Sequence, residues 1–369
     1  MLKKFSVENF KGFKNKITFD IGSPSNYNFN SEIIENGCVT KGIIYGINSS
    51  GKSNLGLAIF DIITHLTDKQ KLLPSYDYYL NMSSKKSFAQ FEYIFSFDGH
   101  EVIYQYSKSD VNVLKSEKLL IDGKEVICFD FISKQGRTLL EGSDTLNVSI
   151  NSDSPISRVK YVNNNSILVD NAENRVFKKF FDFVERMLLF YSLDSRGYEG
   201  FMNGTESIAE GIVNSGKVKD FQDFLKENRI HYEIYPYEID GRKTIYCHFE
   251  NKDADFFKIA STGTRSLALF YYWYIRMKNA SFVFIDEFDA FYHFELSESV
   301  QRHLKKISGV QIFTTTHNTD LMTNDILRPD GYFLLGNNSI NAIADLTDKE
   351  LRQAHNLQKM YKAGAFNGK

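Results

Sequence analysis

The sequence predicts an α/β fold with a mixed sheet, a β-rich lobe and an α+β insertion. Residues 39–63 show a short apolar strand, a glycine-containing loop and an amphipathic helix in succession. Residues 88–130 alternate apolar and polar side chains in the manner of paired strands. Beyond residue 255, strand and helix patterns alternate until the end of the chain. The expected parts are a core of residues 1–65 and 256–369, a lobe of residues 66–130 and an insertion of residues 131–255.

The first part of the core is expected to begin with a pair of strands. Residues 4–20 alternate in the period of a strand, and four apolar side chains occupy the positions that would face a core. Residues 24–36 are rich in serine and asparagine and predict a loop before the next strand. The four candidate core residues are Phe5, Val7, Phe10 and Phe13.

The segment Gly46-Ile-Asn-Ser-Ser-Gly-Lys-Ser53 fits G-x-x-x-x-G-K-[ST], the phosphate-binding P-loop. A strand over residues 39–45 leads into it, and a helix over residues 54–63 follows. This order aims backbone N–H groups and the positive end of a helix dipole at one point, which suits a triphosphate such as ATP. Lys52 would reach the β- and γ-phosphates, and the Ser53 hydroxyl would bind Mg²⁺. The expected ATP contacts in this loop are Gly46, Asn48, Ser49, Ser50, Gly51, Lys52, Ser53 and Asn54.

The middle of the chain predicts a mixture of strands, loops and helices. Residues 67–86 are polar and interrupted by Pro74, which indicates an irregular connection. Asp98-Gly99, Asp122-Gly123 and Asp240-Gly241 are typical hairpin turns. The other expected elements are strands at 91–97, 102–106 and 118–122, a long loop at 141–166, and helices near 174–190 and 217–228.

One apolar stripe in the middle of the chain recurs at helical spacing. It belongs to the helix expected near residues 174–190, and ordinary core packing accounts for it. The stripe consists of Val176, Phe180, Phe183, Val184 and Leu188.

Phe282-Val-Phe-Ile-Asp-Glu287 predicts a buried strand that ends in two carboxylates. A strand that merely ends in solvent-exposed acids is the simpler interpretation, but the P-loop upstream favours a Walker B segment. Asp286 is then expected to hold Mg²⁺, directly or through water. Glu287 is expected to orient or deprotonate the attacking water.

Two further segments complete the predicted site. Residues 310–318 form an apolar strand with a polar end, and in a parallel sheet His317 would face the γ-phosphate beside the Walker B strand. Residues 260–266 precede a helix expected over Leu267–Met277. The start of that helix predicts a second anion site, although a simple N-cap would give the same pattern. The residues of this second site are Ser261, Gly263 and Thr264.

Composition narrows the class of protein. The net charge of −2 provides no overall basic field for nucleic acid, although a local basic face stays open. Three scattered cysteines indicate a reducing compartment rather than a disulfide framework or a zinc site. The first residues lack a signal peptide, and the apolar run Leu267–Ile275 is too short for a membrane span. A cytoplasmic protein without a membrane partner is expected.

Together these segments resemble ATP-binding-cassette ATPases of the RecF/SMC group, with a D-loop at Phe288–Ala290 and a switch histidine at His317. The closer resemblance is to AAA-family ATPases of bacterial abortive-infection and restriction-linked loci, the RloA/AbiL-like proteins. Four segments carry it. They are Ile44–Asn54, Ser261–Thr264, Ile285–His293, and Leu327–Asp330 followed by Tyr361–Phe366.

The resemblance implies an ABC-type ATPase head that hydrolyses ATP with Mg²⁺. Relatives pair as a homodimer with ATP at the interface, so that Ser261, Gly263 and Thr264 would act in trans on the partner's nucleotide. Lys11, in the family-like segment Asn9–Phe13, is expected to join the ATP contacts. Relatives usually regulate a separate effector in anti-phage defence, such as a nuclease or another toxin from the same operon.

Three alternative functions remain. The first is a DNA-binding repair ATPase of the RecF/SMC type, although the middle of the chain lacks the heptads of SMC coiled coils. The second is the ATPase subunit of a transporter, which the long separation of Lys52 from Ser261 and the missing L-S-G-G-Q sequence disfavour. The third is a scaffold that binds ATP without turnover, which would not need a water-activating carboxylate at Glu287.

Overall fold

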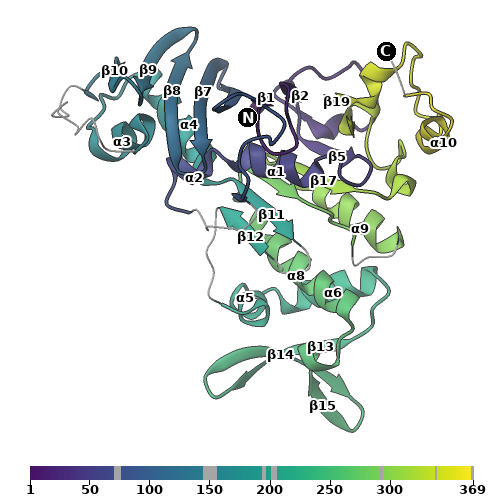
Figure 1. Ribbon diagram of the computed structural model, residues 1–369. Helices are drawn as coiled ribbons and strands as arrows, with labels where there is room; N and C mark the ends of the chain where they lie inside the picture. The colour runs from purple at the N-terminus through teal and green to yellow at the C-terminus, as the bar shows by residue number, and fades with distance from the viewer. Residues whose placement is uncertain are drawn as a thin grey trace. The chain divides into compact units, whose positions relative to one another are not determined.

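A computed structural model describes residues 1–69, 76–143, 156–192, 197–200, 206–290, 294–336 and 339–366 (Figure 1). Helices and several sheets combine in it, which confirms the predicted α/β class. Among the helices that the structure describes, none has both the length and the apolar character needed to cross a bilayer. The chain divides into two compact units: Met1–Met202 with Ala280–Glu287 and Gly309–Lys369, and Asn203–Asn279 with Phe288–Ser308.

The central sheet of the first unit has seven strands in the order β12-β11-β16-β17-β5-β18-β19. Its inner five strands are parallel and its two edge strands are antiparallel, so the sheet is mixed as predicted. Every residue of β5, β16 and β17 is buried, as is usual for the inner strands of a parallel sheet. The strands are β5 (Lys41–Tyr45), β11 (Leu188–Ser192), β12 (Gly197–Gly200), β16 (Phe282–Ile285), β17 (Gln311–Thr316), β18 (Tyr332–Gly336) and β19 (Ser339–Ala342).

A second seven-stranded sheet is antiparallel throughout, in the order β10-β9-β8-β7-β6-β1-β2. The predicted strand pair at residues 4–20 is confirmed, and all four of its candidate core residues are buried. The turns at Asp98-Gly99 and Asp122-Gly123 are confirmed, with positive φ at each residue. The strands are β1 (Leu2–Glu8), β2 (Ile17–Asp20), β6 (Ala89–Phe97), β7 (His100–Asp110), β8 (Val113–Ile121), β9 (Lys124–Asp130) and β10 (Gln135–Thr138), with a separate pair β3 (Ile34–Glu35) and β4 (Cys38–Val39).

Two sequence predictions in the first unit are wrong. The helix expected to reach residue 190 ends at Glu185, and Leu188 begins β11, because an apolar residue there fits both a helical stripe and a buried strand. The loop expected at 141–166 contains α3, which Ser157 caps by accepting a hydrogen bond from the Lys160 amide. Pro74 lies outside the described residues. The helices of this unit are α1 (Lys52–Phe60), α2 (Ile63–Leu66), α3 (Arg158–Asn165), α4 (Ala172–Glu185) and α10 (Leu357–Lys362).

The second unit packs helices against a three-stranded antiparallel sheet, β13-β14-β15 (Figure 1). The helix expected near 217–228 is confirmed as α6, whose buried Phe221 lies 5.0 Å from Tyr271 of α8 between ring centroids. The hairpin at Asp240-Gly241 is confirmed too. The elements are α5 (Ile208–Asn214), α6 (Val218–Glu227), β13 (Glu233–Ile239), β14 (Arg242–Phe249), β15 (Lys252–Asp255), α7 (Phe256–Ile259), α8 (Thr262–Met277) and α9 (Phe294–Lys305).

Candidate nucleotide site

The loop between β5 and α1 turns back tightly on itself. Ser49 and Gly51 have φ values of 65° and 101°, and only glycine adopts the second of these readily. A Cβ atom at Gly46 would lie 2.3 Å from the Ser50 hydroxyl oxygen, so a side chain there would clash. Helix α1 begins at Lys52 without a side-chain cap, which leaves its first amides able to bind an anion.

The buried side chain of Lys52 bends back toward the loop. Its ammonium donates to the carbonyl oxygens of Gly46 (3.0 Å) and Ile47 (3.4 Å) and contacts His317 Nε2 at 2.8 Å. An ammonium can only donate, so His317 Nε2 is the acceptor in this contact. Burial lowers the pKa of Lys52, while the nearby carboxylates of Asp286 and Glu287 oppose that shift.

His317 reaches Lys52 because of the strand order. Strand β17 pairs in parallel with both β16 and β5, so the carboxyl ends of all three strands lie at one edge of the sheet. The prediction that the ends of the Walker B strand and the following strand are neighbours is therefore confirmed. This edge is where open α/β sheets bind ligands.

The two carboxylates after β16 have different surroundings. Asp286 is buried and takes hydrogen bonds from the hydroxyls of Thr315 (2.6 Å) and Ser53. Its pKa is raised, chiefly by burial, against the lowering effect of those hydrogen bonds. The Glu287 side chain is 55% exposed, and its Oε1 lies 3.7 Å from His317 Nε2. Glu287 also has a φ of 45°, which is uncommon outside glycine and recurs at functional sites.

Thr315 is a site residue that the sequence analysis did not single out. Its hydroxyl donates to Asp286 Oδ1 at 2.6 Å and accepts from the Glu287 amide at 2.7 Å, so it fixes both acids. The signal was the run of three threonines that ends the apolar strand β17. Buried hydroxyls require partners, and the residues after the neighbouring strand supply a carboxylate and a backbone amide.

The side chains at this edge fit ATP and Mg²⁺. The Ser53 hydroxyl and the Asp286 carboxylate share a hydrogen bond, so one small cation could contact both. Oxygen ligands of this kind suit Mg²⁺, which proteins usually hold through one or two side chains together with phosphates and water. The uncapped start of α1 and the Lys52 ammonium suit the phosphates.

The expected second anion site lies in the second compact unit. Ser261 caps α8 by accepting from the Thr264 amide at 3.1 Å, and the hydroxyls of these two residues are 2.9 Å apart. Ser261 is therefore the N-cap of α8, while the anion site at the same helix start stays a prediction. Ser261 is exposed and Gly263 opens the first turn of the helix, while the action of this site in trans stays a prediction.

Lys11 lies on a turn beside the P-loop helix. A Cβ atom at Gly12 would lie 3.0 Å from Asn54 Nδ2, which shows how closely this turn packs on α1. The Lys11 ammonium donates to the Asp77 carbonyl oxygen at 2.8 Å, so the structure gives it a partner within the protein. Its contact with ATP stays a prediction. His293 of the family-like segment lies outside the described residues.

The raised pKa of Asp286 predicts a gain in stability when this acid is replaced. The folded protein holds the Asp286 proton to a higher pH than the unfolded chain does, so the wild type loses stability as pH rises through that pKa. The carboxamide introduced by Asp286→Asn cannot ionise and still accepts from Thr315. This variant should therefore melt on the order of a few degrees higher at neutral pH without nucleotide.

Thermal melts of both proteins across a pH series check this expectation. The advantage of Asp286→Asn should shrink as pH falls toward 3.8, the ordinary pKa of aspartic acid. Thr315→Val serves as a comparison, because it removes the hydroxyl and leaves the acid. An equal or lower melting temperature for Asp286→Asn at every pH would refute the expected gain.

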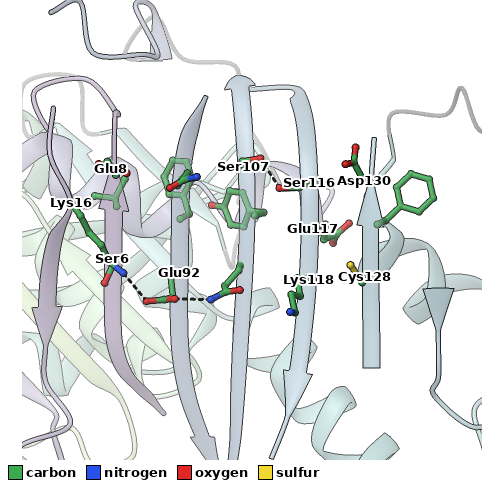
Figure 2. A pocket seen from close by; sticks show the side chains of 16 residues that line it. Ser6, Glu8, Lys16, Glu92, Ser107, Ser116, Glu117, Lys118, Cys128 and Asp130 are labelled. Atoms are coloured by element: carbon green, nitrogen blue, oxygen red, sulfur yellow. Dashed lines mark hydrogen bonds and ion pairs between the residues drawn. The ribbon is translucent and has the colours of Figure 1, made fainter. Parts of the chain in front are cut away.

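A hollow of about 450 Å³ lies on the polar face of the antiparallel sheet (Figure 2). Lys16, Glu92 and Gln105 form a chain of hydrogen bonds across its strands. The opposite face packs on α1 through Tyr93, whose hydroxyl donates to the Ala58 carbonyl oxygen. None of the predicted nucleotide-site residues lines this hollow.

The chain matches a known protein family and is similar to solved structures of other proteins. A family model described as "AAA domain, putative AbiEii toxin, Type IV TA system" matches residues 43–323, a span that includes the P-loop, Ser261, both acids and His317. Curated proteins give no match. Among solved structures, the SMC head domain from Thermotoga maritima is similar at 15% identity, covering 92% of this chain and 98% of that one, with a TM-score of 0.45. An SmcHead bound to the C-winged helix domain of ScpA is similar at 16% identity, covering 92% and 97%, with a TM-score of 0.49.

Proposed function

The chain belongs to this family of AAA domains, and on that premise we propose that it binds and hydrolyses ATP as a switch that controls a partner effector. The observation that carries the proposal is the cluster of Lys52, Glu287 and His317 at one edge of a parallel sheet. A cation for phosphates, an exposed carboxylate for water and a histidine between them match the needs of phosphoryl transfer to water.

Each residue has a role in this proposal. When bound, ATP would supply the γ-phosphoryl group and leave as ADP, and Mg²⁺ would neutralise charge on the phosphate oxygens. Lys52 exchanges its partners within the protein for phosphate oxygens, and Ser53 and Asp286 hold the cation. Glu287 orients water and accepts its proton, while His317 connects the lysine to the carboxylate.

We also propose that a second copy of the chain completes the site through Ser261. The exposed start of α8 would meet the nucleotide bound to the other copy, so that ATP holds the homodimer together. ATP binding would then cause two copies to form the dimer, and ATP hydrolysis would cause the dimer to separate.

Ser261→Arg should bind ATP as the wild type does but fail to form the ATP-dependent dimer. The added side chain would place bulk in the partner's phosphate site, while the P-loop of the same subunit stays intact. Sedimentation with ATP and Mg²⁺ measures the dimer, and ATP titration measures binding. Ser266→Arg, five residues further along the chain and within the same helix, is the matched control. An unchanged dimer in Ser261→Arg would remove Ser261 from the interface.

The family description, which names a putative toxin of type IV toxin–antitoxin systems, supports a toxin–antitoxin context. The resemblance to abortive-infection ATPases that act beside a separate effector is the reason for proposing a partner. The ATP-bound dimer would hold or release a toxic effector, such as a nuclease from the same operon, in anti-phage defence. Hydrolysis would then reset the switch.

A pull-down from the native operon tests this regulatory role. The effector should co-purify with wild type and with Glu287→Gln in different amounts, because the variant keeps the ATP-bound state. If the chain alone protects cells from phage, or is toxic, with no co-purifying protein, then it is itself the effector.

A further inference from the structure

The small sheet β13-β14-β15 has one covered face and one uncovered face. Ile234, Ile245 and Cys247 are buried on the side that packs on helices of the same unit. Side chains alternate along a strand, so Tyr235 and Tyr246, which pair across the strands, point to the opposite side. Helices α5, α6 and α7 of the same unit contact this sheet.

Aromatic rings gather on the uncovered side. The ring centroids of Tyr237 and Tyr246 are 4.3 Å apart, and Tyr235 lies 6.3 Å from Tyr237 and 6.4 Å from Tyr246. Tyr237 and its neighbour Ile239 are each 42% exposed. We call Tyr235, Tyr237, Ile239 and Tyr246 the tyrosine face. A contiguous aromatic surface of this kind marks an interaction site more often than isolated apolar residues do.

The charges around the tyrosine face are mainly negative. Asp253 accepts hydrogen bonds from the Tyr235 hydroxyl and from His248 Nδ1, the latter at 2.8 Å, and Glu233 lies opposite His248 across the strands. From Glu233 to Asp255 the sequence holds six acidic and three basic residues, and of the basic ones Arg242 pairs with Ile239 on the same side as the tyrosines. One of the basic residues, Lys243, is turned to Asn214 of α5 at 2.9 Å.

We propose that the tyrosine face docks a partner protein through a segment that carries arginine or lysine side chains. A cation over a tyrosine ring, with a carboxylate at its edge, gains both a cation–π contact and an ion pair. Stacked nucleic acid is the less suitable occupant, because its phosphates would approach Asp253 and Glu233.

This inference rests on the proposed function in one respect: the tyrosine face would be the surface that binds the effector or another partner. Its test needs no nucleotide. If the peptide does not bind, the proposal of ATP hydrolysis is therefore unaffected. If the chain does not hydrolyse ATP, the proposal of peptide binding is unaffected.

The experiment is an anisotropy titration of a labelled peptide of alternating arginine and serine with the full chain. Tyr237→Ser should weaken binding about tenfold, from the loss of one cation–π contact and its neighbouring surface. Phe249→Ser is the matched control, since Phe249 is also 42% exposed but shares the alternation of Cys247 on the covered face. It should bind the peptide as the wild type does.

Two further probes decide between occupants. A peptide with glutamate in place of arginine and an oligothymidylate should both bind more weakly than the arginine peptide. Tighter binding of the oligothymidylate would assign the face to nucleic acid and overturn the proposal. So would equal affinity of Tyr237→Ser and wild type, no binding by the wild type, or equal losses in Tyr237→Ser and Phe249→Ser. Melting curves confirm that both variants fold.

Discussion

Glu287→Gln is expected to lower kcat for ATP hydrolysis by about 10²- to 10⁴-fold and to leave ATP binding nearly unchanged. The Glu287 side chain is exposed at the carboxyl end of β16, and its Oε1 is 3.7 Å from His317 Nε2. A carboxamide keeps the shape of this group but cannot accept a proton from water. The variant should therefore accumulate in the ATP-bound state and, with it, as a dimer.

Phosphate release measures turnover in this variant, and sedimentation with ATP and Mg²⁺ measures the dimer. Glu298→Gln is a suitable control, because Glu298 pairs with Arg302 within α9 and is not among the predicted site residues. Turnover at the wild-type rate in Glu287→Gln would mean that another group activates the water.

Lys52→Ala should weaken ATP binding by roughly 10- to 100-fold, as expected when a hydrogen bond to a charged group is lost. The Lys52 ammonium now has acceptors in Gly46, Ile47 and His317, and phosphate oxygens would take their place. Because burial already disfavours the charged lysine, its loss should leave the melting temperature close to that of the wild type.

Calorimetric titration with ATP and Mg²⁺ measures the affinity of Lys52→Ala. Lys16→Ala is the control, since Lys16 pairs with Glu92 on the polar face of the antiparallel sheet. Wild-type affinity in Lys52→Ala would contradict the P-loop assignment.

The geometry of the candidate site follows closely from sequence motifs. The P-loop, the two acids after β16 and His317 each end an apolar strand, and parallel pairing brings such ends to one edge. Thr315 could not be assigned from the sequence, because a buried threonine hydroxyl needs partners but the sequence does not show which ones. Both of its polar contacts come from the residues after the neighbouring strand β16.

Local sequence patterns could not predict which strands pair when they lie far apart in the sequence. Strand β1 pairs with β6, which lies beyond the P-loop helix in sequence. No residue pattern in either strand identifies the other as its partner. Leu188 shows a different limit, since its apolar side chain suits the end of α4 and the start of β11 equally well. Tertiary contacts with β16 decided that boundary.

The most direct test of a nucleotide site shared between two copies mixes two inactive variants, Lys52→Ala and Ser261→Arg, and measures ATP hydrolysis. A heterodimer of the two would pair one intact P-loop with one intact Ser261, so random mixing in equal amounts should restore up to about a quarter of wild-type activity. Each variant alone should stay inactive. A mixture as inactive as its components, with ATP binding by Ser261→Arg intact, would contradict the shared site.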